Sequence, residues 1–192
     1  VQGAVWVEET WQGKAFMITS FGRLQAREEQ EAGTLTGNNS AYWRSSFLAS
    51  PFSEDPVFHG PEVEMAASLK AAGKLLRYVP DVRVQHFYEE GFGNFMDFGR
   101  YWGWCFLNAR RSGDTALPYR GLFNALGPFA PLAMLPAKLT IDVIRLVQRW
   151  NDYRLNLRQG VAIVALLSVN AFAVSYGGLL RVLGKNVPEP LY

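Results

Sequence analysis

The sequence predicts an α/β domain followed by membrane-associated helices. Over residues 1–115, acidic, basic and aromatic side chains are interleaved, as they are in a water-soluble domain. Two uncharged stretches follow, of 17 residues over 121–137 and of 22 residues over 159–180. A helix needs about 20 apolar residues to cross a bilayer core, so the second stretch is long enough to span a membrane. We therefore expect the membrane-associated region to cover residues 116–192.

Short apolar runs and turn residues predict that the first part mixes strands and helices. Gly37, Asn38 and Asn39 form a turn, because glycine and asparagine tolerate left-handed backbone. Pro80 and Asp81 separate two further strands. The expected strands cover Ala4–Val7, Thr34–Thr36, Leu75–Val79 and Val82–Phe87, and a short helix covers Ser40–Leu48.

A better-marked helix begins at Gly60-Pro61. Proline suits the first turn of a helix, because its missing N–H would have no partner there. Glu62 and Glu64 bring negative charge to the positive end of the helix dipole. Gly73 is suited to end the helix, because glycine readily adopts the left-handed conformation found there.

The C-terminal part is expected to contact a membrane in three ways. The stretch over 121–137 contains three prolines, which kink a helix, so we expect it to be re-entrant or to lie on the membrane surface. Residues 138–158 combine apolar residues at helical spacing with five Lys or Arg residues, which predicts a basic amphipathic helix at the lipid headgroups. The alternative is a helix packed on the soluble domain. A helix over 160–181 is expected to span the membrane.

Two further expectations concern that span. Ser168, Asn170 and Ser175 would need hydrogen-bond partners inside lipid. The arginines before the span favour the cytoplasmic leaflet, which would place the soluble domain on the cytoplasmic face. Arg181 and Lys185 beyond the span make this orientation signal a mixed one.

Composition excludes several classes of protein. The net charge of +2 over 192 residues gives no large cationic field, so we expect no nucleic-acid partner. A single cysteine excludes an internal disulfide framework and a cysteine-based zinc site. Two histidines exclude a metal site built from several histidines. The apolar content is high enough to rule out disorder as the main state.

Residues 36–86 hold most of the side chains that could do chemistry. Singly, each has an ordinary explanation, such as turn formation for Asn38 and Asn39 or first-turn charge for Glu62. Their order is more informative. The run reads Gly37-Asn38-Asn39, Tyr42-Trp43-Arg44, Phe52-Ser53-Glu54-Asp55, Gly60-Pro61-Glu62-Val63-Glu64, Leu69, Gly73, Pro80, Val84 and His86.

This order resembles the second half of a family 2 glycosyltransferase of the GT-A fold, over about residues 1–110. The resemblance implies an inverting enzyme that transfers a sugar from a nucleotide-sugar donor to a lipid-linked or cell-envelope glycan acceptor. It implies Glu62 as the general base, where the family has aspartate, and Pro61 replaces an acidic residue before it. It also implies that Gly37, Asn38 and Asn39 line the pocket for acceptor and donor sugar.

The resemblance assigns two further residues. His86 matches a histidine that approaches the metal-bound diphosphate and is a candidate ligand for Mn²⁺ or Mg²⁺. Arg100 lies in a stretch spaced like the Gln-x-x-Arg-Trp motif of processive members and is a candidate diphosphate ligand. Asp97 and Tyr101 replace the Gln and Trp of that motif, so synthesis of a polymer is not expected. A solvated helix arginine is the equally weighted alternative for Arg100.

The family's nucleotide-binding half, with its Asp-x-Asp metal motif, has no counterpart in this sequence. The chain begins with Val1, and we expect it to be a C-terminal piece of a longer enzyme that is inactive in isolation. Two other interpretations stay open. One is a non-catalytic, membrane-anchored module that binds a partner or lipid, and the weaker one is a transporter or channel component.

Overall fold

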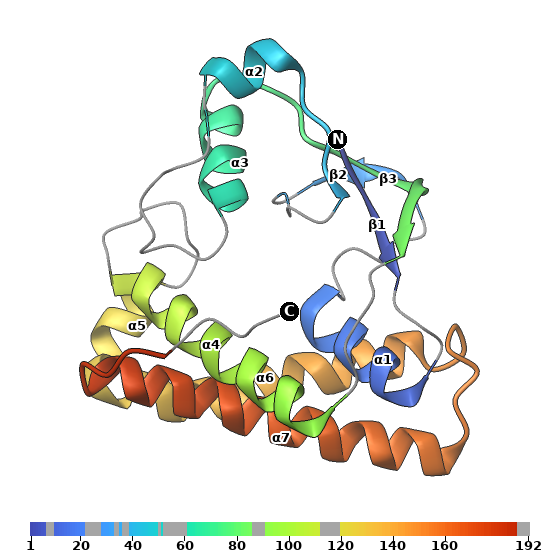
Figure 1. Cartoon of the computed structure of the whole chain (residues 1–192), viewed down its shortest axis with the longest axis vertical. Helices are drawn as coiled ribbons and strands as arrows, with labels where there is room; N and C mark the ends of the chain where they lie inside the picture. The colour runs from blue at the N-terminus through green and yellow to red at the C-terminus, as the bar shows by residue number, and fades with distance from the viewer. Residues whose placement is uncertain are drawn as a thin grey trace. The chain divides into compact units, whose positions relative to one another are not determined.

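The computed structural model shows a mixed α/β chain that forms two compact units. The sheet unit comprises Val1–Val7 and Phe21–Phe87, and the helical unit comprises Glu8–Ser20 and Tyr88–Tyr192. Figure 1 labels the elements of both. The structure describes residues 1–6, 10–21, 28–32, 35, 39–49, 51, 61–85, 91–111 and 120–187.

The sheet unit contains a small sheet of three strands in the order β1-β3-β2. The strands are β1 (Gln2–Trp6), β2 (Gln30–Glu31) and β3 (Arg77–Gln85). β3 lies in the middle, parallel to β1 and antiparallel to β2. Val5, Leu35, Met65 and Tyr78 are fully buried and form part of the core of this unit.

β3 corrects the prediction of two strands on either side of Pro80-Asp81. It is one continuous strand, and the irregularity lies in its pairing with β1. Gly3 pairs with Val79, but the next residue, Ala4, pairs with Arg83. Residues 80–82 are therefore left out of the ladder, which accommodates a proline that has no N–H to donate.

The strand predicted at Thr34–Thr36 lies largely outside the described residues, and Leu35 between them is buried but not in a strand. The predicted strand at Ala4–Val7 is found as β1, two residues earlier. The short helix is found as α2 (Arg44–Ala49), which begins four residues later than expected. The delay arises because Ala41 exchanges backbone hydrogen bonds of 2.8 and 2.9 Å with Val1 and is held extended.

The helix predicted between residues 61 and 73 is confirmed as α3 (Pro61–Ala71). Gly73 follows it with φ +69°, in the left-handed region that glycine adopts at helix ends. The backbone N–H groups of Gly73 and Lys74 donate to the carbonyls of Lys70 and Leu69 and close the last turn. Met65, Ala66 and Leu69 form the buried side of α3.

The helical unit is built around a long C-terminal helix, α7, which contacts α1, α4 and α6. The prediction divided the chain into two parts after residue 115. The helical unit differs from the predicted second part, because it also includes α1 and α4. The elements are α1 (Trp11–Phe16), the π-helical turn η1 (Met17–Phe21), α4 (Phe92–Arg111), α5 (Arg120–Leu126), the 3₁₀ turn η4 (Gly127–Phe129), α6 (Ala130–Arg149) and α7 (Leu157–Val182).

α4 and α7 pack with their backbones in close contact, because glycines lie at the crossing. A Cβ atom added to Gly103 would overlap the carbonyl group of Val174, and one added to Gly177 would overlap the carbonyl group of Arg100. Gly99 and Gly103 are spaced as a small-xxx-small pair, the pattern that lets helices approach closely in membranes. Leu107 and Val174 are buried beside this contact, with Met134 of α6.

The uncharged stretch over 121–137 forms parts of three elements: α5, η4 and the first turns of α6. Pro128 lies in η4 and Pro131 in the first turn of α6, positions where a missing N–H costs little. Pro136 lies inside α6. The amphipathic helix predicted over 138–158 is not continuous, because α6 ends at Arg149 and a turn leads into α7 at Leu157.

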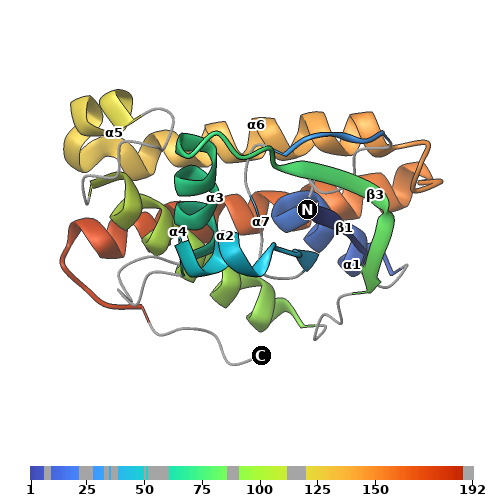
Figure 2. The same cartoon turned by 90° about the horizontal axis from the view of Figure 1, so that it is seen from above.

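α6 and α7 form an antiparallel helical hairpin, and Figure 2 shows them side by side. Asn156 caps α7: its side chain accepts from the N–H of Gln159 at 2.9 Å, and the Gln159 side chain accepts from the N–H of Asn156 at 3.1 Å. Trp150, at the end of α6, covers Gly160, where an added Cβ atom would overlap the indole ring. These contacts fix the geometry of the turn between the two helices.

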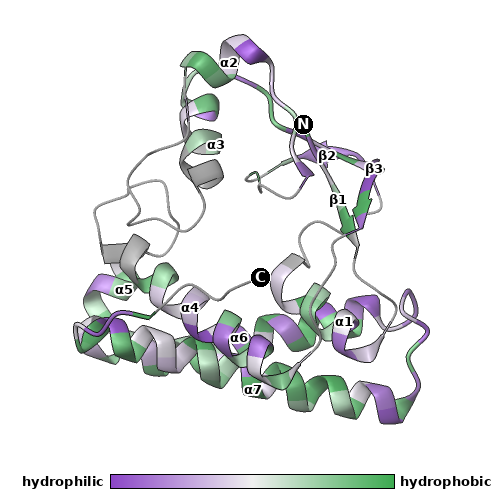
Figure 3. Ribbon diagram, in the orientation of Figure 1, coloured by the Kyte–Doolittle hydropathy of each residue, from purple (hydrophilic) through white to green (hydrophobic). Residues whose placement is uncertain are grey.

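α7 is long and apolar enough to cross a membrane, and half of its most apolar window is buried within the structure. Figure 3 colours most of this helix green or white. The three polar residues expected to need partners have them. Ser168 donates to the carbonyl of Val164 at 2.8 Å, Ser175 to that of Pro131 at 2.6 Å, and Asn170 to that of Phe95 at 3.4 Å.

We predict that Gly103→Ala lowers the free energy of unfolding by about 1–3 kcal/mol, because the new methyl group must push α4 away from α7. Gly93→Ala is the matched control on the same helix, since nothing lies within 4 Å of a Cβ at that position. Denaturant titration of the full chain in detergent, followed by tryptophan fluorescence, measures both. Equal stabilities of the two variants would contradict the close backbone contact.

Candidate functional site

The predicted site residues are described to different extents. Gly37, Asn38 and His86 lie outside the described residues. Glu62 is described by its backbone, within α3. Asn39 and Arg100 are described with their side chains, but they belong to different units.

Glu62 lies in the first turn of α3, directly after the proline that begins the helix. A carboxylate is stabilised at this end of a helix by the partial positive charge of the free N–H groups. At about 100° per residue, position 62 falls on the same helix face as Met65 and Leu69, which are buried. Position 64 falls on the opposite face, with the exposed Ser68. The two acidic positions are therefore not equivalent.

The Asn39 side chain bridges the two parallel strands at the irregularity in β3. Its amide nitrogen donates to the carbonyl of Ala4 at 2.9 Å and to that of Val82 at 3.0 Å. Ala4 is the residue at which the pairing resumes, and Val82 is one of the residues left out of the ladder. Asn39 therefore replaces backbone hydrogen bonds that the strands lack at this point, a role that was not predicted.

A second side chain, Gln2, supports the same region. Gln2 is fully buried. It donates to the carbonyl of Gly3 at 3.0 Å and to that of Asn39 at 2.8 Å, and it accepts from the Ser40 hydroxyl at 2.8 Å. Asn39 and Ser40 are thus attached to β1 through both backbone and side-chain groups.

Arg100 lies in the middle of α4. One of its terminal nitrogens contacts the Asp97 carboxylate at 2.9 Å, one helical turn earlier, and about a third of its side chain is exposed. Its Nε atom is buried and has no hydrogen-bond partner among the described residues. The guanidinium is therefore only partly engaged by Asp97.

Within the described part of the chain, no group of three or more His, Cys, Asp or Glu side chains is placed to hold a metal ion. His86, the predicted ligand, lies outside it. The described residues thus supply no metal site of their own.

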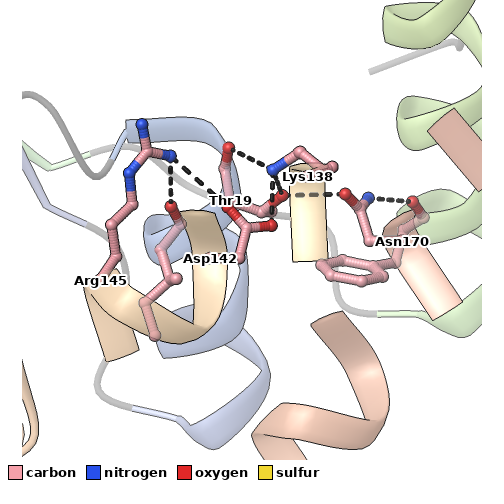
Figure 4. Close-up of polar contacts among 7 residues, drawn as sticks. Thr19, Lys138, Asp142, Arg145 and Asn170 are labelled. Atoms are coloured by element: carbon pink, nitrogen blue, oxygen red, sulfur yellow. Dashed lines mark hydrogen bonds and ion pairs between the residues drawn. The ribbon is translucent and has the colours of Figure 1, made fainter. Parts of the chain in front are cut away.

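A polar cluster inside the helical unit was not predicted as a site (Figure 4). Asp142 of α6 has no solvent exposure, and its carboxylate contacts Lys138 at 2.6 Å and Arg145 at 3.5 Å. Lys138 also donates to both the hydroxyl and the carbonyl oxygen of Thr19, and Arg145 donates to the carbonyl of Ile18 at 3.3 Å. The cluster therefore attaches η1 to α6.

Thr19 and Asn170 extend the cluster to two more helices. The Thr19 hydroxyl donates to the Asn170 side-chain oxygen at 2.8 Å, and the Asn170 amide reaches the carbonyl of Phe95 in α4. Four elements, η1, α4, α6 and α7, are thus joined by one chain of hydrogen bonds. The spacing of Lys138, Asp142 and Arg145 on one helical face was the sequence signal for it.

Comparisons with known protein families, curated proteins and solved structures found no match to this chain. The function proposed below therefore depends on the motifs and contacts of the chain itself.

We predict that Asn39→Asp destabilises the sheet unit by about 2 kcal/mol or more, because both donated hydrogen bonds are lost and the carboxylate faces two carbonyl oxygens. Ser40→Ala is the control, since it removes one hydrogen bond to Gln2 and should cost about 1 kcal/mol. Hydrogen exchange of the β1 and β3 amides in the full chain measures the difference. Unchanged protection in Asn39→Asp would show that the bridge is unimportant.

Removing the buried charge at Asp142 should be much more damaging. We expect Asp142→Asn to cost about 3–5 kcal/mol, because Lys138 and Arg145 would keep their charges without a counter-ion. Asp97→Asn is the matched control: it also breaks an arginine pair on a helix, but Asp97 is half exposed, so the loss should stay within about 1 kcal/mol. Denaturant titrations that give similar losses for the two would disprove the role of Asp142.

Proposed function

We propose that this chain is part of an inverting glycosyltransferase that works at a membrane, with Glu62 as the general base. The observation that carries the proposal is the start of α3 at Pro61, which places Glu62 in the first turn of the helix. The order of motifs from Gly37 to His86 supports the assignment to a family 2, GT-A-type enzyme. The length and hydropathy of α7 support membrane association.

In this reaction the Glu62 carboxylate takes the proton from an acceptor hydroxyl as its oxygen attacks the anomeric carbon of the donor sugar. The bond between that carbon and the nucleotide diphosphate breaks from the opposite side, so the configuration inverts. The acceptor is a lipid-linked or cell-envelope glycan, because the helical unit would hold the site near lipid, on the cytoplasmic face. The charge on the leaving diphosphate calls for a divalent cation, Mn²⁺ or Mg²⁺, in the complete enzyme.

The other site residues have supporting roles in this proposal. Gly37, Asn38 and Asn39 line the pocket for acceptor and donor sugar. Arg100 pairs with the diphosphate, for which its partly engaged guanidinium is chemically suited.

A second function is favoured by one observation, the commitment of the Asn39 amide to two backbone carbonyls. Donors that hold the sheet together are not free for a sugar hydroxyl. With Pro61 in place of an acidic residue, this favours a non-catalytic, membrane-anchored module that keeps the framework of the family without its activity.

The two functions are separated by Glu62→Gln, introduced into the full protein as the cell makes it. We expect sugar transfer to fall by about 10²–10⁴-fold, because glutamine cannot accept the proton. Glu64→Gln is the matched control and should keep its activity, since position 64 lies on the opposite face of α3. The measurement is transfer of radiolabel from a panel of UDP-, GDP- and dTDP-sugars to the lipid and glycan fractions of membranes that contain the protein.

Membrane binding of the Glu62→Gln and Glu64→Gln variants should equal that of the unmodified protein. Equal activity of Glu62→Gln and the unmodified protein would exclude Glu62 as the base. Absence of transfer from every donor by the unmodified protein would favour the non-catalytic module.

A further inference from the structure

α6 turns its charged side chains inward. Its four charged residues fall within about 60° of one another around the helix, and their side chains are between 0 and 25% exposed. A helix on the surface of a water-soluble protein does the reverse, with charges toward water and apolar residues toward the core. The four residues are Lys138, Asp142, Arg145 and Arg149.

The outer face of α6 carries no charge. Its large apolar side chains are exposed by between 47 and 67%. Thr140 and Gln148 are the polar residues among the exposed positions of this helix. A face of this kind, outside a helix with an internal ion cluster, is typical of a helix surrounded by lipid, where ionisable side chains turn to the protein interior. The apolar residues are Leu132, Ile141, Ile144 and Val147.

α7 has an outer face of the same kind. Exposed large apolar residues lie three or four positions apart over 157–164 and again over 172–183, and they are between 37 and 74% exposed. Its charged residues, Arg158 and Arg181, lie in the first and last turns. The exposed residues that define the face are Leu157, Val161, Val164, Phe172, Tyr176 and Leu179, with Leu183 directly after the helix.

The two outer faces belong to one rigid hairpin. Ser175 of α7 bonds to the carbonyl of Pro131 at one end of the contact, and Trp150 of α6 covers Gly160 at the other. Gly178 allows Met134 to lie directly against the backbone of α7. Contacts along the whole length mean that α6 cannot stay in water while α7 enters lipid unless the hairpin separates.

We propose that α6 lies in the hydrocarbon layer of a membrane beside α7, with its uncharged outer face against lipid chains and its ion cluster turned inward. The charged residues at the two ends of the hairpin indicate that lipid is what covers this outer face. The segment from Arg149 to Arg158 holds three arginines and one aspartate at the turn of the hairpin. Near the other end, the Trp104 indole donates to the carbonyl of Lys185, with the Arg181 guanidinium 5.4 Å from its ring. Arginine and tryptophan at both ends, with Lys185 at one of them, suit anionic headgroups.

This inference rests on the membrane association in the proposed function and is independent of sugar transfer. It differs from the expectation for residues 138–158, in which Lys138 and Arg145 would reach the headgroups. In the structure these two side chains contact Asp142 and η1 instead.

Spin labelling tests the proposal. The full chain, with Cys105→Ser to remove its single thiol, receives one cysteine as Ile144→Cys, Phe172→Cys or Ala72→Cys. Each variant is labelled with a nitroxide and reconstituted into vesicles of phosphatidylcholine and phosphatidylglycerol. Collision rates of the label with O₂, which concentrates in lipid, and with a water-soluble nickel chelate are measured. Position 72 is the control, because it is exposed at the end of α3 in the sheet unit.

We expect the labels at 144 and 172 to shift strongly toward O₂ collisions relative to position 72. A label at 144 that meets the nickel chelate as often as position 72 would place α6 in water and overturn the proposal. Low collision rates with both reagents at 144 would also overturn it, because they would show that a protein surface, such as a second copy of the chain, covers α6. A lipid-exposed label at 144 with a water-exposed label at 172 would contradict a shared hairpin. None of these results depends on enzymatic activity.

Discussion

Asp142 carries its carboxylate at a position without solvent exposure, and much of the helical unit is arranged to satisfy that group. A buried carboxylate is costly unless cations and hydrogen bonds surround it. Lys138 and Arg145, one turn away on either side, supply the cations, and their remaining hydrogen bonds go to Thr19 and Ile18. The π-helical turn must therefore lie against α6, and Thr19 in turn binds Asn170 of α7. The ion cluster and its hydrogen bonds thus hold η1 against both α6 and α7. Glycines determine how closely α4 and α7 approach each other.

The sequence was sufficient for those parts of the fold in which local signals and tertiary contacts agree. Pro61 and Gly73 mark the two ends of α3 correctly, because first-turn proline and left-handed glycine act locally. The uncharged run in α7 likewise predicts a long helix. Local signals failed at Pro80, where the sheet keeps one strand continuous by leaving three residues out of the ladder. They also failed for the end of α6, because the pattern of apolar residues continues past Arg149 while Trp150 turns the chain toward Gly160.

The candidate site was less predictable than the fold. Glu62 was correctly placed in a helix, because the signal that begins α3 is local. The use of Asn39 could not have been foreseen, since its two acceptors lie 35 and 43 residues away in sequence. The charges of α6 were visible in the sequence, but their direction was not. Periodicity shows that charges and apolar residues lie on opposite faces, and only the position of α1 and η1 shows which face is inside.

Gly3 and Asn39 share a single small space between β1 and β3. A Cβ atom on Gly3 would overlap both the Asn39 amide and the backbone carbonyl of Val82, so two groups restrict position 3 to glycine. If Asn39 were replaced by a smaller residue, the backbone carbonyl of Val82 would still leave no room for a side chain at position 3. In diverging descendants of this chain, Gly3 should consequently persist even where position 39 has changed, because the backbone of the neighbouring strand excludes a side chain there.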